Sequence, residues 1–350
     1  MRRIESTGVS IMKVRQAVVM VGGKGTRLLP LTENHPKPIL SVADRPCIWY
    51  LVRSLARAGI EEVILACGYK PGHMEALGDG SDLGIRIIYS YEDEPRGTAG
   101  AMKLVEDRLD DVFVACNGDV FADIDVKEEI DMHISTGASI TIALTPVENP
   151  TEFGIVRTEA DGRITEFKEK PRPEEVFSNL INAGVYVVDR SVLGYVPEDT
   201  FFDFSKDLVP LVMNDNGRIQ GYTLSGLWMD VGRPHDLLEA NLAVSNREYS
   251  KRSFPAEDSC IRGDFYMGEG SKVANSELKS SVVLKGCTVT DSNLNRVLLM
   301  KGCTVKGSHI ENSIIGEGST IKEGCRIFNA VLADNTVLEP DTELDGGRIV

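Results

Sequence analysis

The chain has 350 residues, of which 42% are hydrophobic and 26% are charged, and its formal net charge is −15. At about 150 residues per domain, this length predicts two domains. The acidic excess disfavours electrostatic binding to nucleic acid or to an anionic membrane surface, because both are negatively charged. No run of residues approaches the roughly 18 apolar residues of a membrane span. An anion bound by this chain must therefore be held by a local cluster of donors or cations.

The N-terminal segment and the cysteines bear on cellular location. Residues 1–12 are predicted to be an N-terminal extension, because Arg2 and Arg3 are not followed by the apolar core of a signal peptide. Two interpretations stay open: a disordered extension, or residues ahead of a native start at Met12. The seven cysteines are odd in number and contain no C-x-x-C pair, which argues against a disulfide framework and a zinc site. We therefore expect reduced thiols and a cytoplasmic protein.

Residues 13–250 have the pattern of an α/β domain. Short apolar runs, expected to be strands, alternate with stretches of helical apolar spacing. Such alternation predicts parallel strands with crossover helices, and ligands bind such sheets at the carboxyl ends of the strands. Gly22 and Asp119 each lie just beyond a predicted strand. The expected strands are 17–21, 62–66, 86–89 and 112–116, and the expected helices are 49–58 and 99–109.

Residues 251–350 follow a different period. One apolar residue recurs at every fifth or sixth position, and the tetrapeptide Gly-Cys-Thr-Val at 286–289 returns at 302–305. This step fits neither a helix nor a flat strand, but it fits a triangular parallel β-solenoid of about five coils of roughly 16 residues each. A β-sandwich is the alternative. Cys287 and Cys303 fall at equivalent corners, either as small buried side chains or, alternatively, as part of a metal ladder.

A glycine-rich turn follows the first predicted strand. Segment 21–28 reads Val-Gly-Gly-Lys-Gly-Thr-Arg-Leu, and segment 36–38 reads Pro-Lys-Pro. Glycines after a buried strand let backbone N–H groups approach phosphate oxygens. Lys24, Arg27 and Lys37 add positive charge to these segments. The turn is neither a P-loop nor a G-x-G-x-x-G dinucleotide fingerprint, so it predicts a phosphate site without specifying its class.

Eight segments, taken in order, resemble the signature of the sugar-1-phosphate nucleotidyltransferases, or NDP-sugar pyrophosphorylases. The resemblance implies an α/β, Rossmann-like nucleotidyltransferase domain over residues 13–250, followed by a C-terminal left-handed parallel β-helix over residues 251–350. It also implies Mg²⁺-dependent transfer of a nucleoside monophosphate from an NTP to a sugar 1-phosphate, with release of pyrophosphate. The segments are residues 22–32, 36–38, 94–100, 117–119, 153–154, 169–171, 182–184 and 228–232.

The residue types agree with the chemistry of that reaction. Attack on an α-phosphate that is already negative needs positioning and charge neutralisation more than covalent catalysis, and Mg²⁺ prefers carboxylates together with phosphate oxygens. The resemblance assigns catalytic roles to Arg27, Lys37, Asp119, Lys170 and Asp230, with Asp119 and Asp230 as the Mg²⁺ ligands. It assigns nucleotide binding to Val21, Gly22, Gly23, Gly25, Thr26, Arg27, Lys37, Gly97, Thr98 and Asp119, and sugar-phosphate binding to Gly154, Glu169, Lys170 and Asn182.

Finer similarity indicates the substrates. Val21 at the start of the glycine turn is similar to the GDP-mannose pyrophosphorylase branch, and so are segments 84–87 with 92–100, 167–171, 177–186 and 228–234. We therefore expect GTP and α-mannose 1-phosphate, and synthesis of UDP- or dTDP-glucose is the alternative. Two further alternatives stay open: a catalytically silent regulatory subunit, and a bifunctional enzyme whose β-helix transfers acyl groups with His309 as base. The β-helix is expected to join copies of the chain in a homo-oligomer.

Overall fold

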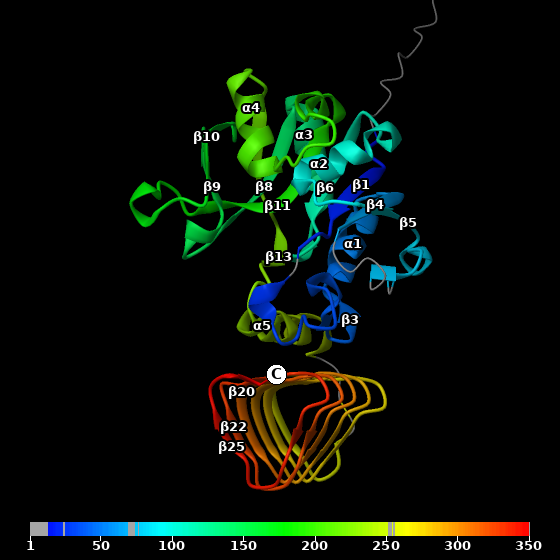
Figure 1. Cartoon of the computed structure of the whole chain (residues 1–350), viewed down its shortest axis with the longest axis vertical. Coiled ribbons are helices and arrows are strands. Elements are labelled where there is room, and N and C mark those ends of the chain that lie inside the picture. The colour runs from blue at the N-terminus through cyan, green and yellow to red at the C-terminus, as the bar shows by residue number, and fades with distance from the viewer. Residues whose placement is uncertain are drawn as a thin grey trace, which may run out of the picture.

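The computed structural model describes residues 13–23, 25–68, 74–75, 77–250, 254 and 256–349. The predicted extension and Lys24 lie outside the described residues. Figure 1 shows an α/β part above a coiled stack of short strands, with α5 (Pro234–Val244) and β3 (Arg45–Pro46) near their junction. Within the described ranges, no helix combines the length and the apolar character that crossing a membrane requires.

One large sheet forms the α/β part. The described residues contribute nine strands in the order β10-β9-β11-β6-β1-β4-β5, with β8 beside β11 and β12 beside β8. The strands are β1 Gln16–Met20, β4 Glu62–Cys67, β5 Arg86–Tyr91, β6 Val112–Asn117, β8 Ile140–Pro146, β9 Gly154–Thr158, β10 Ile164–Glu169, β11 Leu180–Asp189 and β12 Ile219–Thr223.

The sheet is mixed rather than all parallel. Strands β6, β1, β4 and β5 run parallel, as their alternation with helices predicts. Beyond β6 the direction changes, since β11 pairs antiparallel with β6, β8 and β9, and β9 pairs antiparallel with β10. The prediction of parallel pairing is therefore confirmed for the four strands expected from the sequence, and the sheet continues beyond them with antiparallel neighbours and one further parallel pair, β12 with β8. Antiparallel neighbours such as β9, β10 and β11 need no crossover helix, so no helix–strand alternation precedes their pairing.

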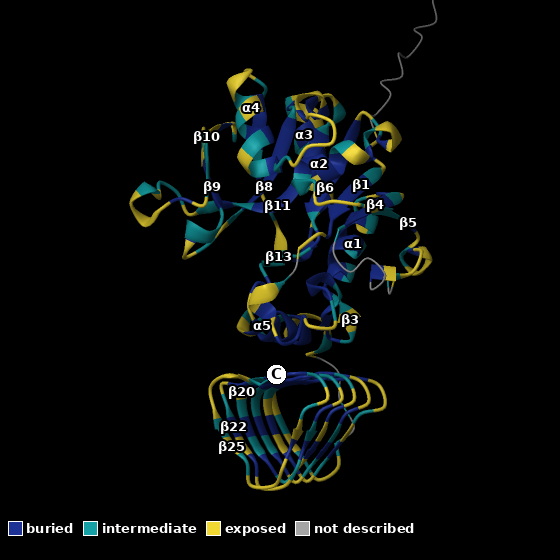
Figure 2. Cartoon of the chain, in the orientation of Figure 1, coloured by how far each residue is buried: buried dark blue, intermediate teal, exposed yellow. Residues whose placement is uncertain are grey.

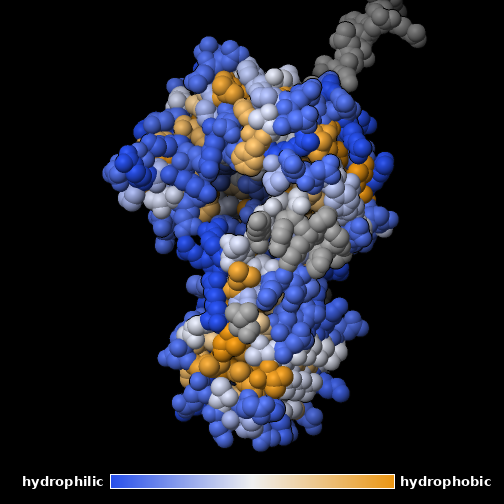
Figure 3. All heavy atoms as spheres, in the orientation of Figure 1, coloured by the Kyte–Doolittle hydropathy of each residue, from blue (hydrophilic) through white to orange (hydrophobic). Residues whose placement is uncertain are grey.

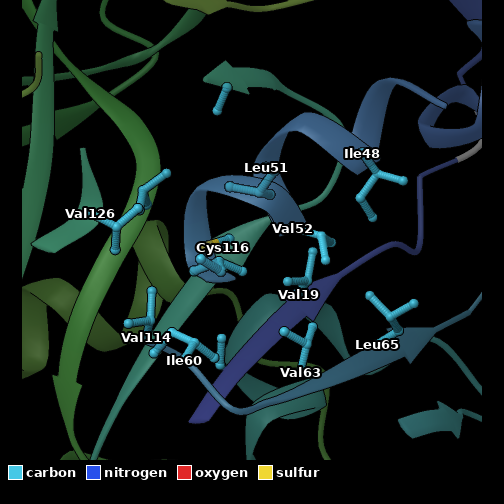
Figure 4. Close-up of a cluster of buried hydrophobic side chains, with 14 of the residues drawn as sticks. Val19, Ile48, Leu51, Val52, Ile60, Val63, Leu65, Val114, Cys116 and Val126 are labelled. Atoms are coloured by element: carbon cyan, nitrogen blue, oxygen red, sulfur yellow. The ribbon is translucent and has the colours of Figure 1, made fainter. Parts of the chain in front are cut away.

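Helix α1 (Cys47–Arg57) covers one face of the parallel strands. Figure 4 shows its residues Leu51 and Val52 packed against Val19 and Val63 of the sheet. Burying a side chain of this size contributes about 1.5–3 kcal/mol, so this face anchors the strands that lead to the glycine turn. The predicted helix at 99–109 is shorter than expected, because α2 stops at Leu104. The remaining helix bounds are α2 Gly97–Leu104, α3 Val126–Thr136 and α4 Val209–Asn214.

Two small antiparallel sheets lie beside the main one. Strand β2 (Ser41–Val42) pairs with β3, and β7 (Phe121–Ile124) pairs with β13 (Gly226–Met229). Strand β13 ends one residue before Asp230. Pairing of β13 with β7 therefore brings Asp230 near the strand that follows Asp119.

The C-terminal part is a parallel β-helix. Bonds between neighbouring coils join residues 16 apart in the early coils and 17 apart in the late ones, in agreement with the predicted repeat. Cys287 is buried, and its thiol donates a hydrogen bond to the carbonyl oxygen of Met300, 3.0 Å away. Among the described residues, no group of three or more potential ligands could form the alternative metal ladder.

The strands of the β-helix stack in two described sheets. The larger sheet contains β14 Cys260–Met267, β16 Glu277–Val283, β18 Asn293–Leu299, β20 His309–Ile315, β22 Arg326–Phe328, β23 Val331–Leu332, β25 Glu343–Asp345 and β26 Arg348–Ile349. The smaller sheet contains β15 Lys272–Ala274, β17 Thr288–Thr290, β19 Thr304–Lys306, β21 Thr320–Ile321 and β24 Val337–Leu338.

A shared apolar cluster joins the two parts. Leu237 and Leu238 of α5 belong to the same buried cluster as Val282 and Leu298 of the β-helix. Figure 2 shows buried residues both in the main sheet and along the strands of the β-helix. The β-helix therefore packs directly against the helix that follows Asp230.

Candidate active site

The glycine turn lies at the carboxyl end of β1. Val21 is buried, and its N–H donates to the carbonyl oxygen of Ala66, 2.9 Å away. Gly22 and Gly23 are exposed, and Gly25 has a φ of +61°, which a glycine adopts without the strain that a Cβ would bring. The exposed Thr26 begins the short 3₁₀ helix Thr26–Leu28, which carries Arg27. The turn thus places open backbone and a guanidinium group at one strand end.

Lys37 lies between two carboxylates. Its ammonium nitrogen is 3.2 Å from Oδ2 of Asp119 and 3.1 Å from Oδ1 of Asp230. The three residues come from distant segments, since 82 positions separate Lys37 from Asp119 and 193 separate it from Asp230. The structure therefore brings together three of the predicted catalytic residues.

The charge state of Lys37 follows from these neighbours. Burial by itself would lower the pKa of Lys37, because the side chain is only 7% exposed. Asp119 and Asp230 outweigh that effect and raise its pKa above the ordinary value. Lys37 is therefore a permanent cation near neutral pH, held in place by two carboxylates.

Arg27 also lies near the Asp230 carboxylate. Its Nη2 lies 3.9 Å from Oδ2 of Asp230, and its Nη1 lies 2.8 Å from Oε2 of Glu152. Glu152 also binds Arg233, with 2.5 Å between Oε1 and Nη2. Glu152 thus joins two guanidinium groups, one from the glycine turn and one from the loop after β13.

The predicted sugar-phosphate residues lie around the β9–β10 pair. Gly154 opens β9 and is paired with Glu169 at the end of β10. Burial raises the pKa of Glu169, Asp203 raises it further, and Lys170 lowers it. Lys170 has a φ of +45°, an unusual conformation for a side chain that is not glycine, and its N–H donates to the carbonyl oxygen of Phe153 at 3.0 Å. The Glu152–Gly154 segment therefore links the predicted sugar-phosphate residues to Arg27.

Two predicted side chains are engaged within the protein itself. The amide nitrogen of Asn182 donates to the hydroxyl oxygens of Tyr186 and Ser205, at 2.9 and 3.1 Å. The hydroxyl of Thr98 donates to Asp203 at 3.2 Å. It also accepts a bond of 2.7 Å from the N–H of Phe204. Gly97 opens the same helix, α2, so these bonds dock its first turn against the segment 203–208.

Sequence reasoning missed Glu152 and Asp203 in this region, and it placed Arg233 in segment 228–234 without assigning it a role. Glu152 directly precedes the Phe-Gly dipeptide at 153–154, so adjacency to a motif was the available signal for it. Asp203 lies near no motif that points to it. Figure 3 shows the surface hollowed beside the lobe formed by β9 and β10, on the face turned to the viewer.

The arrangement provides a cationic group beside a carboxylate pair. Arg27 and Lys37 are suited to phosphate oxygens, because guanidinium and ammonium groups form charge-assisted hydrogen bonds with them. Asp119 and Asp230 are suited to a hard divalent cation. This combination is typical of sites for metal-bound polyphosphates.

Comparison with known proteins agrees with this geometry. A family model described as nucleotidyl transferase matches residues 16–247, which is more than half of the chain. The chain belongs to the nucleotidyl transferase family. A second model, the C-terminal hexapeptide of GlmU-like proteins, matches residues 265–346. The family prediction from the motifs and the predicted Rossmann-like domain with a left-handed β-helix are thus confirmed.

This nucleotidyl transferase is similar to several named proteins. It is 40% identical over 228 residues to the mannose-1-phosphate guanylyltransferase of Mycobacterium tuberculosis, a match covering 64% of this chain and 63% of the relative. It is 39% identical over 230 residues to the mannose-1-phosphate guanyltransferase of Aspergillus oryzae, covering 64% and 62%. The matches thus span less than two thirds of both relatives.

A solved structure supports the fold as well. A Bacillus anthracis protein provisionally named a glucose-1-phosphate thymidylyltransferase, in complex with a sucrose, superposes with a TM-score of 0.61 at 25% identity. The superposition covers 69% of this chain and 98% of that protein.

Proposed function

We propose that this nucleotidyl transferase forms an NDP-sugar and pyrophosphate from an NTP and a sugar 1-phosphate. The observation that carries the proposal is the Lys37 ammonium group, which contacts carboxylates from two strand ends with Arg27 beside them. GTP and α-mannose 1-phosphate are the proposed substrates, because relatives 40% and 39% identical are named for that pair. Synthesis of UDP- or dTDP-glucose remains the second candidate.

The proposed reaction is a single displacement at phosphorus. An oxygen of the sugar phosphate forms a bond to the α-phosphorus of the NTP. The bond between that phosphorus and the oxygen bridging to the β-phosphorus breaks, and pyrophosphate leaves with that oxygen. Arg27 and Lys37 would hold the β- and γ-phosphates and offset the negative charge that develops on the leaving group.

Asp119 and Asp230 fit the Mg²⁺ ion that the family resemblance implies. Both carboxylates reach one cation, the Lys37 ammonium group, and the Asp119 side chain is 47% exposed. No larger cluster of ligating side chains is found in the described part of the chain, so phosphate oxygens and water would supply the other ligands. When bound, Mg²⁺ would neutralise charge on the reacting phosphates.

The sugar phosphate is proposed to bind beside the β9–β10 pair. Lys170 would bind the phosphate, and Glu169 would accept hydrogen bonds from sugar hydroxyls. Gly154 leaves room at the start of β9, opposite Glu169. Asn182 already donates two bonds within the protein, so it would border the sugar and hold Tyr186 and Ser205 in place.

A pyrophosphate-release screen tests the proposal. Four NTPs are crossed with the 1-phosphates of mannose, glucose, galactose and N-acetylglucosamine, with and without Mg²⁺. GTP with mannose 1-phosphate should give the highest kcat/KM. If UTP or dTTP with glucose 1-phosphate gives the highest kcat/KM instead, the proposed substrates are wrong and the proposed type of reaction stands. No activity in any combination would favour the silent regulatory subunit. The homo-oligomer and the cytoplasmic location stay predictions.

A further inference from the structure

The segment that carries Lys37 contains a hairpin turn with a strained backbone. Ala43 and Asp44 connect β2 to β3, and their φ angles are +45° and +64°. Two successive left-handed residues are typical of tight hairpins, but glycine or asparagine usually supplies them. Alanine in this conformation persists only where surrounding contacts determine it. The turn therefore points to external contacts that hold it.

The β-helix supplies those contacts through Asp44. Oδ1 of Asp44 accepts a hydrogen bond from the N–H of Lys285 at 2.9 Å, and Oδ2 accepts one from the hydroxyl of Tyr266 at 3.0 Å. A Cβ at Gly268 would lie 2.1 Å from Oδ2 of Asp44. A glycine at position 268 is thus needed for this side chain to seat between the first two coils.

The other end of the Lys37 segment also touches the β-helix. Nδ2 of Asn34 lies 3.4 Å from Oδ2 of Asp334, and Nε2 of His35 lies 3.9 Å from the same oxygen. Oδ1 of Asp334 accepts a 2.9 Å bond from the N–H of Glu317, which fixes the carboxylate on its coil. Lys37 is therefore bracketed along the chain by two contacts with the β-helix.

Helix α5 holds the middle of the same segment. Asn241 is completely buried, accepts a 2.9 Å bond from the N–H of Ala43 and donates a 3.2 Å bond to the carbonyl oxygen of Ser41. Helix α5 itself packs against β14, β16 and β18 of the β-helix. Direct and indirect contacts thus connect the β-helix to the segment on both sides of Lys37.

We infer that the β-helix positions Lys37 for catalysis and that Asp44 is the positioning residue at its anchor. The inference rests on the proposed function, because it concerns how Lys37 is held against the triphosphate. Lys37 contacts both Asp119 and Asp230 near 3 Å, so a small shift of its segment breaks both contacts. A displacement of about 1 Å is enough to lower catalysis by roughly a hundredfold.

Four variants of the full chain test the inference. Asp44→Ala removes both acceptors for the β-helix. Asp44→Asn keeps an acceptor for Lys285 and tolerates a positive φ, so it serves as the conservative rescue. Asp291→Ala is the matched control, because Asp291 is an exposed aspartate with a φ of +52° whose carboxylate accepts a bond from Asn275 of the neighbouring coil. Tyr266→Phe is a milder fourth variant in case Asp44→Ala folds poorly.

The readout separates positioning from a folding defect. Asp44→Ala is expected to raise the KM for the NTP and lower kcat/KM for the NTP by roughly 10- to 100-fold, while the KM for the sugar 1-phosphate stays within about twofold. Asp44→Asn should recover most of this loss, Tyr266→Phe should show a smaller change of the same kind, and Asp291→Ala should match wild type.

Two results would overturn the inference. One is an Asp44→Ala enzyme with wild-type kinetics. The other is a lower kcat with both KM values unchanged and a lower Tm, because a smaller fraction of folded enzyme gives that pattern without moving Lys37. An inactive wild-type protein would instead count against the proposed function. Calorimetric measurement of NTP affinity would then still compare Asp44→Ala with wild type, and equal affinities would reject the positioning role.

Discussion

Arg27 and Glu152 form an ion pair between the glycine turn and the segment that precedes β9, with 2.8 Å between Nη1 and Oε2. The side chains are 54% and 39% exposed, so the pair itself contributes at most about 1 kcal/mol to stability. An incoming triphosphate must compete with Glu152 for Arg27. The pair therefore predicts that Glu152 weakens NTP binding.

A Glu152→Gln variant is expected to lower the KM for the NTP about two- to fivefold at low ionic strength. The difference should fade as salt is added, because exposed charges are screened. Steady-state kinetics at two salt concentrations measure the effect. A higher KM for the NTP would show instead that Glu152 orients Arg27 for binding.

The Asp119 carboxylate is expected to be essential for turnover. Asp119→Ala should lower kcat at least about a hundredfold, equivalent to about 2.7 kcal/mol of transition-state stabilisation. Asp111→Asn is the control, because Asp111 is 86% exposed and pairs with Arg190 away from Lys37. If purified Asp119→Ala kept the wild-type kcat at saturating Mg²⁺, the assignment of Asp119 as a metal ligand would be wrong.

Lys170 is expected to act mainly on the sugar phosphate. Lys170→Ala should raise the KM for the sugar 1-phosphate by roughly 10- to 100-fold, the value of a charged hydrogen bond, with little change for the NTP. Lys170→Asn separates charge from backbone strain, because asparagine tolerates the +45° φ of this position. Lys168→Ala is the control, since Lys168 pairs with Glu175 at 2.9 Å. If Lys170→Ala, Lys170→Asn and Lys168→Ala all have the same KM for the sugar phosphate, Lys170 does not bind the sugar phosphate.

The buried Glu129 of α3 predicts a loss of stability at higher pH. Burial raises its pKa well above the ordinary 4.5, although the backbone N–H of Ala143 opposes the shift. The folded state therefore retains a proton that the unfolded state releases, and stability falls as pH rises from 4.5 toward the folded pKa. At pH 8, Glu129→Gln should raise Tm by about 2–4 °C for each 1 kcal/mol that the substitution adds to the free energy of unfolding. At pH 5 the rise should be smaller. A Tm difference independent of pH would contradict this.

His133, one turn further along α3, predicts a loss of stability in acid. Burial lowers its pKa from 6.5 to about 4 although Asp189 opposes the shift, and its Nδ1 lies 3.0 Å from the hydroxyl of Thr141. Between pH 6.5 and 4 the unfolded state binds a proton that the folded state does not. The free energy of unfolding therefore decreases as the pH is lowered, by at most about 3 kcal/mol. In His133→Asn the urea midpoint should vary less between pH 6.5 and 4. A slope equal to that of wild type would rule out His133 as the source.

Local patterns in the sequence were enough to predict the main elements. The apolar runs at 62–66 and 112–116 correspond to β4 and β6, because buried strands need little more than a short apolar segment. The five-to-six-residue step predicted the β-helix, since each coil repeats the same local geometry. The order of the motifs likewise identified the family, because each motif is a short contiguous segment.

Only the tertiary structure decided which residues meet. Asp44 and Lys285 are 241 positions apart, and no local period connects a hairpin tip to the corner of a solenoid coil. The same holds for Glu152, which pairs with Arg27 across 125 positions. Ion pairs and hydrogen bonds depend on distances of a few ångströms, which the packing of α5 and β13 sets and the sequence does not display. Sequence thus determined the elements and the chemistry available at this site, and packing determined the contacts that hold Lys37 in it.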